Sequence, residues 1–130
     1  MIVFRNSDKP LGPADPASFI GNAQAKLLAS SDSGESVHVY RVEFGNNART
    51  NWHRHTGPQW LLVIAGRIRI QLWGSPPHEL QTGDAVVIEP GEKHWHGAAP
   101  GLDGAHMAIN VNATTEWLEA VSDKQYAGSD

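Results

Sequence analysis

The chain has 130 residues, which is enough for one domain with a packed core. Hydrophobic residues make up 40% and charged residues 18% of it, which excludes an intrinsically disordered chain. The formal net charge of −4, without any block of basic residues, argues against nucleic acid and anionic membranes as partners. The absence of cysteine rules out disulfides, thiolate metal ligands and cysteine nucleophiles.

The first nine residues contain no apolar stretch long enough for a secretory signal, and the longest apolar run, residues 60–65, is too short to cross a bilayer. We therefore expect a cytoplasmic protein without a secretory signal or a membrane span. Glycine and proline recur in the first thirty residues, which predicts an extended N-terminal arm over residues 1–30. Within this arm, residues 23–28 fit either an early strand or a turn of helix.

Alternating apolar and polar residues next predict a core of strands over roughly residues 36–112. The predicted strands are residues 37–44, 60–64, 67–73, 85–89 and 106–111. Thr114 or Thr115 can cap a helix over residues 116–121, with a further turn near Tyr126, so a C-terminal helix is expected within residues 114–126. Many short strands and one terminal helix indicate an all-β sandwich or barrel, as a single domain over residues 1–130.

Two pairs of histidines suggest a metal site. They are His53-Arg54-His55 and His94-Trp95-His96. Residues two positions apart lie on the same face of a strand, and Gln59, four positions after His55, has the same parity. One such pair alone is more typical of surface residues or of structural histidines. Two pairs beside glycine and proline turns favour a barrel in which nitrogen and oxygen donors converge on a transition metal.

The spacing of these residues resembles the double motif of the cupin family. The residues that carry the resemblance are, in order, Gly45, His53, His55, Gln59, Gly66, Gly83, Pro90, Gly91 and His94. This chain departs from the usual pattern by a longer gap after Gly45 and by adjacent Pro90 and Gly91. Gln59 also replaces the usual acidic ligand, and Ala98 replaces a common asparagine. The resemblance implies a double-stranded β-helix, the jelly-roll barrel of that family.

Further segments of the sequence resemble one subgroup of the cupin family. They are residues 12–15, 48–50, 52–53, 90–100 and 123–126. In them the chain is similar to small bacterial cupins with manganese-dependent hydroxynitrile lyase activity, the (R)-mandelonitrile lyase-like cupins. That likeness implies one divalent ion, manganese in that group, with iron, nickel and zinc left open. The implied ligands are His53, His55, Gln59 and His94. The likeness also implies a homodimer or homotetramer.

The neutral amide of Gln59 bears on the expected chemistry, because it leaves more positive charge on a metal centre than a carboxylate would. This favours redox-neutral Lewis-acid chemistry, such as cyanohydrin cleavage, over oxygen activation at iron held by two histidines and one carboxylate. The reaction needs a base within reach of a small-molecule substrate. His96 shares the parity of His94, and the resemblance implies His106 in the active-site cavity. A purely structural role for His96 stays equally open.

The rest of the predicted pocket consists of Tyr40, Val42 and Asn110. The first two border it by resemblance, with Tyr40 in place of a smaller residue, and Asn110 shares a strand face with His106. Arg49 is interpreted as a surface or ion-paired residue rather than a ligand for an acidic substrate. The five tryptophans are expected in the core or at subunit contacts. A metal-dependent dioxygenase acting on a small organic molecule and a non-enzymatic ligand-binding cupin stay open as alternatives.

Overall fold

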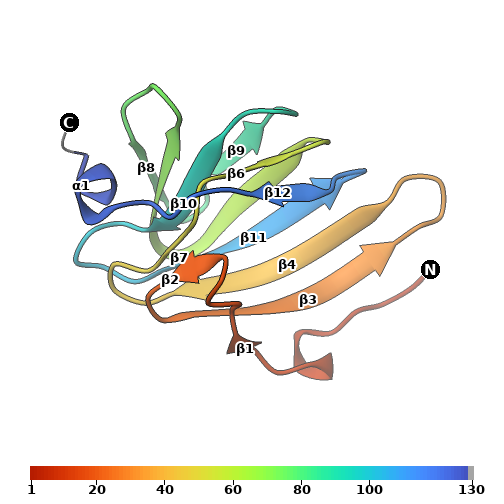
Figure 1. Ribbon diagram of the computed structural model, residues 1–130. Coiled ribbons are helices and arrows are strands. Elements are labelled where there is room, and N and C mark those ends of the chain that lie inside the picture. Colours follow the sequence, from red (N-terminus) through yellow and green to blue (C-terminus); the bar gives the residue numbers. More distant parts are fainter. Residues whose placement is uncertain (129–130) are drawn as a thin grey trace.

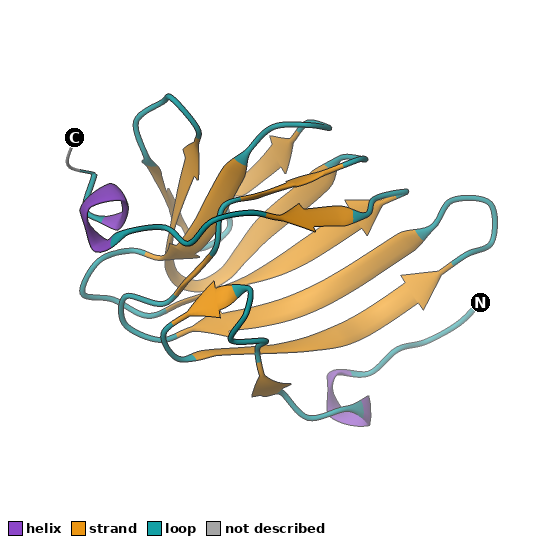
Figure 2. Cartoon of the chain, in the orientation of Figure 1, coloured by secondary structure: helices purple, strands orange, loops and turns teal. Residues whose placement is uncertain are grey.

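The computed structural model describes residues 1–128, which form a curled antiparallel sheet (Figure 1). In chain order the strands are β1 (Gly12–Pro13), β2 (Phe19–Ile20), β3 (Ala23–Ser31), β4 (Val37–Phe44), β5 (Arg49–Thr50), β6 (His53–His55), β7 (Gln59–Leu72), β8 (His78–Gln81), β9 (Ala85–Ile88), β10 (His94–Ala98), β11 (Gly104–Val111) and β12 (Thr115–Trp117). A 3₁₀ turn (Asn6–Asp8) and helix α1 (Asp123–Tyr126) complete the described chain. The predicted all-β fold with one short C-terminal helix is therefore confirmed (Figure 2). No helix in residues 1–128 is long and apolar enough to span a bilayer.

Strand β7 joins the two layers of the barrel. Its first half pairs with β11 and β9, and its second half pairs with β10 and β8. The change of partner falls at Gly66, whose φ is +61°. A Cβ atom there would stand 2.1 Å from the carbonyl oxygen of Asp103, so only glycine fits this close approach. The two strands predicted at 60–64 and 67–73 are thus one continuous strand that bends at Gly66.

The alternation of side chains along β7 separates the barrel interior from the outer surface. Leu61 and Val63 point inward and are fully buried, whereas Trp60 and Leu62 point outward and are 49% and 40% exposed. Burying a side chain such as Leu61 contributes about 1.5–3 kcal/mol. The apolar core at one end of the barrel consists of Ala23, Val42, Phe44, Ala48, Val63, Ile68 and Ala98.

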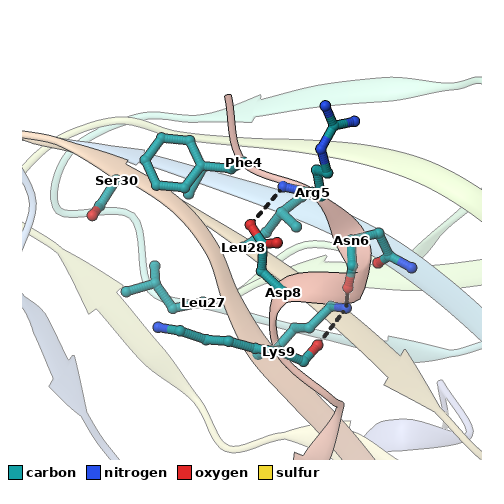
Figure 3. A pocket seen from close by; sticks show the side chains of 10 residues that line it. Phe4, Arg5, Asn6, Asp8, Lys9, Leu27, Leu28 and Ser30 are labelled. Atoms are coloured by element: carbon teal, nitrogen blue, oxygen red, sulfur yellow. Dashed lines mark hydrogen bonds between the residues drawn. The ribbon is translucent and has the colours of Figure 1, made fainter. Parts of the chain in front are cut away.

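The N-terminal boundary differs from the prediction. Residues 23–31 form strand β3, which is the first of the two structures expected for residues 23–28, and β3 pairs along its length with β4. The sheet therefore begins well before residue 36. The preceding residues lie along β3, where the Lys26 ammonium donates to the main-chain carbonyls of Asn6 and Lys9. Figure 3 shows this region, including the bond from the Arg5 amide to Asp8 Oδ2 (2.9 Å).

The helix predicted from Thr114 or Thr115 over residues 116–121 is wrong. Residues 115–117 form strand β12 instead, because their backbone pairs with β6. The helix begins after Ser122, whose hydroxyl accepts from the Gln125 amide (3.1 Å) while the Gln125 side chain accepts from the Ser122 amide (2.9 Å). Of the region 114–126 assigned to helix, only Asp123–Tyr126 is helical.

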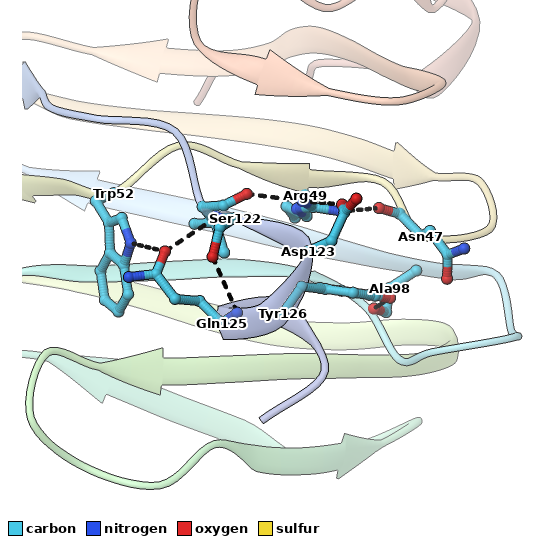
Figure 4. Close-up of polar contacts among 9 residues, drawn as sticks. Asn47, Arg49, Trp52, Ala98, Ser122, Asp123, Gln125 and Tyr126 are labelled. Atoms are coloured by element: carbon cyan, nitrogen blue, oxygen red, sulfur yellow. Dashed lines mark hydrogen bonds and ion pairs between the residues drawn. The ribbon is translucent and has the colours of Figure 1, made fainter. Parts of the chain in front are cut away.

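Arg49 fastens the C-terminal helix to the barrel (Figure 4). Its guanidinium is buried and donates to the carbonyl of Val121 (2.7 Å) and to Asp123 Oδ1 (2.9 Å). It also lies 4.7 Å above the ring of Tyr126, whose hydroxyl donates to the carbonyl of Ala98. Arg49 is thus ion-paired, as one reading of the sequence had it, and it does not line the cavity described below.

Candidate metal centre

Four side chains converge where β6 meets β10. Strand parity puts His53 and His55 on one face of β6, and the antiparallel register places His94 directly opposite His53. The ring centroids of His53 and His94 are 4.2 Å apart, and the His55 ring lies 5.0 Å from His53 and 5.4 Å from His94. All three rings are buried, as is Gln59 at the start of β7. The structure therefore brings together the four ligands predicted from the sequence.

Main-chain carbonyls fix the tautomers of two of these histidines. His53 Nδ1 lies 2.8 Å from the carbonyl oxygen of Asn51, and His94 Nδ1 lies 2.8 Å from that of Glu92. A carbonyl oxygen only accepts, so in both rings Nδ1 carries the proton. The Nε2 lone pairs of His53 and His94 are thus left for a metal ion.

The amide of Gln59 is oriented by Asn110. Gln59 Nε2 donates to Asn110 Oδ1 (2.8 Å), which directs Gln59 Oε1 toward the histidines. That oxygen lies 3.3 Å from His94 Nε2. Asn110, predicted as a pocket residue, is placed to act through Gln59 as well, because it makes the amide present an acceptor rather than a donor.

The donor set fits a divalent transition metal. His55 Nε2 is buried and has no hydrogen-bond partner within residues 1–128. Burial lowers the pKa of all three ring systems: to about 4 for His94, well below 6.5 for His53, and below 6.5 for His55. The rings are therefore neutral at pH 7, which is the form that binds metal. Neutral imidazoles with an amide oxygen suit several divalent ions, manganese included.

A second histidine pair adjoins the first. His106 Nε2 lies 2.9 Å from His96 Nδ1, and both rings are buried. Burial lowers the pKa of His106 to about 4 and that of His96 well below 6.5. The ligand atoms of His96, His53 and His94 all lie within 4.8 Å of one another, so His96 is close enough to serve as a ligand as well as a base.

A cavity of about 430 Å³ opens onto these groups. His53, His55, Gln59, His96 and His106 contribute its polar wall, and Tyr40, Val42 and Asn110 line it as predicted. The face of β11 that carries His106 also carries Ala108 and Asn110 into the cavity. The sequence therefore identified the correct face of this strand.

Among the cavity residues that the sequence analysis missed, two contact the candidate ligands. Thr115 Oγ1 lies 2.9 Å from His55 Nδ1, and the Trp117 indole lies 4.6 Å from the His53 ring, centroid to centroid. Both belong to β12, which the sequence assigned to a helix. Trp52 and Trp95 are buried in the core as expected, whereas Trp117 lines the cavity. Recognising the alternation of Thr115 and Trp117 as a strand would have placed both on one face.

Comparisons with known proteins agree with this arrangement. Residues 40–111 match the model of the Cupin domain family. The chain is 40% identical over 118 residues to a protein of Granulicella tundricola named (R)-mandelonitrile lyase, covering 88% of each. A cupin-like protein from Thermotoga maritima superposes with a TM-score of 0.86 at 34% identity, covering 96% of this chain and 98% of that one. An acetylacetone dioxygenase from Acinetobacter johnsonii shares the fold alone, with a TM-score of 0.67 and 15% identity over 85% of this chain and 74% of that one.

Proposed function

Because the chain belongs to the Cupin domain family, we propose that it is a divalent-metal-dependent lyase that cleaves and forms cyanohydrins. The identity to a protein named (R)-mandelonitrile lyase supports this choice among the many chemistries that the fold supports. The observation that carries it is the buried bond between His96 and His106 beside the histidine–glutamine cluster, which supports a role for this pair in accepting a proton.

His53, His55, Gln59 and His94 would hold the ion, and manganese is the proposed one. When bound, a divalent ion supplies Lewis acidity, which makes the hydroxyl proton of a cyanohydrin easier to remove. None of these four side chains carries a negative charge, so that acidity is not weakened by a carboxylate. This supports redox-neutral chemistry over oxygen activation.

His96 is the proposed base. With its Nδ1–H donating to His106 Nε2, its own Nε2 carries a lone pair, and this atom has no hydrogen-bond partner in the described chain. His96 Nε2 takes the hydroxyl proton, the electron pair of the O–H bond becomes the second bond of the carbonyl, and the C–CN bond breaks. The departing cyanide takes the bond's electron pair and receives the proton from His96, which leaves an aldehyde and hydrogen cyanide. His106 holds the His96 ring in the required tautomer and supports its transient charge.

The cavity residues would orient a small, uncharged substrate. Val42 and Ala108 offer an apolar wall, and Tyr40 adds a phenol beside it. The buried Arg49 is bound to the C-terminal segment, so it offers no charge to an acidic substrate. Two charged residues do line the cavity: Asp15, whose carboxylate accepts from the Ala17 amide, and Lys26, whose ammonium donates to the carbonyls of Asn6 and Lys9. With both side chains bound to main-chain groups, the cavity suits a neutral cyanohydrin.

The test begins with metal analysis of protein purified without chelators. The manganese-loaded protein is then incubated with mandelonitrile, and benzaldehyde release is followed. We expect release above the solution background, loss of it in His53→Ala, and a large decrease in His96→Gln that still binds manganese. A rate for the wild type no faster than that of His53→Ala would refute the proposal. Oxygen uptake with an organic substrate would instead support the dioxygenase alternative.

A further inference from the structure

Strand β12 supports both histidines of β6. It pairs with β6 alone among the described strands and lies beside it in Figure 1. The register sets Thr115 opposite His55 and Trp117 opposite His53. Each inward-facing residue of β12 thus contacts one imidazole, Thr115 by a hydrogen bond and Trp117 by its ring.

His55 is held differently from the other two histidines among the candidate ligands. His53 and His94 each bond to the carbonyl two residues earlier in their own segment, so local structure fixes their tautomers. His55 Nδ1 bonds instead to the hydroxyl of Thr115, which comes from a strand far along the chain. A hydroxyl can donate or accept, so this contact alone does not decide which ring nitrogen carries the proton.

The surroundings of His55 Nε2 indicate which of the two ring nitrogens carries the proton. If His55 Nε2 carried the proton, this buried donor would make no hydrogen bond of normal geometry in the part of the chain that the structure describes, because the Gln59 side chain beside it is not in hydrogen-bonding position. An unsatisfied buried donor or acceptor costs about 1–3 kcal/mol, but a metal ion can satisfy a lone pair at Nε2 and cannot satisfy an N–H group there. The favoured arrangement is therefore Nδ1–H donating to Thr115 Oγ1, which leaves the Nε2 lone pair facing Gln59 and the other two histidines.

We propose that Thr115 is a positioning residue of the metal centre: its hydroxyl holds His55 in the Nδ1–H tautomer and in the ring orientation that presents Nε2 to the ion. This rests on the metal site of the proposed function but not on the reaction. Thr115 lies beyond residues 40–111, which match the family model. One of the three histidines thus depends on a residue outside the matched region.

The chain offers matched variants for a test. Thr115→Val removes the hydroxyl but keeps a β-branched side chain, Thr115→Ser keeps the hydroxyl, and Thr115→Ala is a second variant without it. Thr114→Val is the control, because the exposed Thr114 side chain bonds to Thr56 Oγ1 (3.2 Å) and to none of the candidate ligands. Circular dichroism and thermal unfolding check that each variant folds.

The experiment titrates Mn²⁺ into the metal-free, full-length chain by calorimetry and records nitrogen-15 imidazole spectra of the same proteins before any Mn²⁺ is added. We expect Thr115→Val and Thr115→Ala to bind Mn²⁺ roughly 10- to 100-fold more weakly than the wild type, the usual effect of losing a partner of a ligating histidine. Thr115→Ser and Thr114→Val should bind like the wild type. In the spectra, the signal of the unprotonated His55 Nε2 should be present in the wild type and lost in Thr115→Val.

Three results would overturn the inference. The first is Mn²⁺ binding by Thr115→Val and Thr115→Ala that is as tight as in the wild type. The second is binding by Thr115→Ser that is as weak as in those two variants, and the third is a wild type that binds no divalent metal. A wild type that binds Mn²⁺ but does not cleave mandelonitrile refutes the proposed function only. Weaker binding in Thr115→Val would still support the positioning role in that case.

Discussion

Replacing Arg49 with methionine tests how the segment after β12 is held in place. The Arg49 side chain is only 4% exposed, and methionine keeps an apolar stem while removing the guanidinium. The substitution leaves the buried carbonyl of Val121 without its donor and removes the cation from the Tyr126 ring. It also breaks the ion pair with Asp123.

The contacts that Arg49→Met removes differ in how much they contribute to the free energy of unfolding. A hydrogen bond from a charged donor contributes about 1.5–3 kcal/mol, and the contact with the Tyr126 ring about 0.5–1 kcal/mol. Asp123 is 98% exposed, so its ion pair should contribute no more than about 1 kcal/mol. Arg49 Nε has no partner among residues 1–128, and its removal relieves a burial penalty. We therefore expect Arg49→Met to lower the free energy of unfolding by about 2–3 kcal/mol, and Asp123→Asn by less than about 1 kcal/mol.

Denaturant unfolding at pH 7, followed by circular dichroism, measures both variants. Equal losses for Arg49→Met and Asp123→Asn would refute the reasoning, because they would show that the exposed ion pair, rather than the buried carbonyl, holds the segment. An Arg49→Met protein as stable as the wild type would refute it too.

Three further predictions concern the cavity, the buried histidines and the outer surface. Asn110→Leu removes the oxygen that accepts from Gln59 Nε2 and orients the Gln59 amide. A hydrogen bond of this kind contributes about 1 kcal/mol, so the Mn²⁺ affinity measured by calorimetry should fall about five-fold. Unchanged affinity would show that the amide is held by other contacts. Burial lowers the pKa of His106 from 6.5 to about 4, so below pH 6.5 the unfolded chain takes up a proton that the folded chain does not. Each buried histidine with a lowered pKa should reduce the free energy of unfolding of the metal-free protein by about 1.4 kcal/mol per pH unit as the pH falls from 6.5 toward 4. Equal free energies of unfolding at pH 7 and pH 5 would contradict this prediction. We also expect the wild type to sediment as a dimer or tetramer through the apolar outer face at Trp60 and Leu62, and Trp60→Lys to dissociate it; a wild type of only 14.1 kDa would contradict that prediction.

The sequence predicted that the candidate ligands lie close together because their geometry is local. Two histidines separated by one residue share a strand face whatever else the chain does, and the cupin spacing indicated which strands meet. The buried faces of β4 and β11 followed from the same alternation. These features depend only on period-two patterns and on motifs within short segments.

The features that were missed depend on contacts between distant segments. Thr114 and Thr115 satisfy the rule for a helix cap, but pairing with β6 outweighs that local preference and makes residues 115–117 a strand. The partner of His55 was therefore not predicted from the sequence. The buried setting of Arg49 was missed for the same reason, because its acceptor is the carbonyl of Val121, which belongs to the last part of the chain.

The direct pairing of His53 with His94 has a consequence for the kinetics of unfolding. The two histidines come from strands far apart in the sequence, so they meet only once the barrel has closed. An ion bound by both stabilises the closed barrel but none of the open states that precede it. Mn²⁺ should therefore slow unfolding while leaving the folding rate nearly unchanged, so that the bound metal sets the lifetime of the folded chain rather than the speed at which it forms.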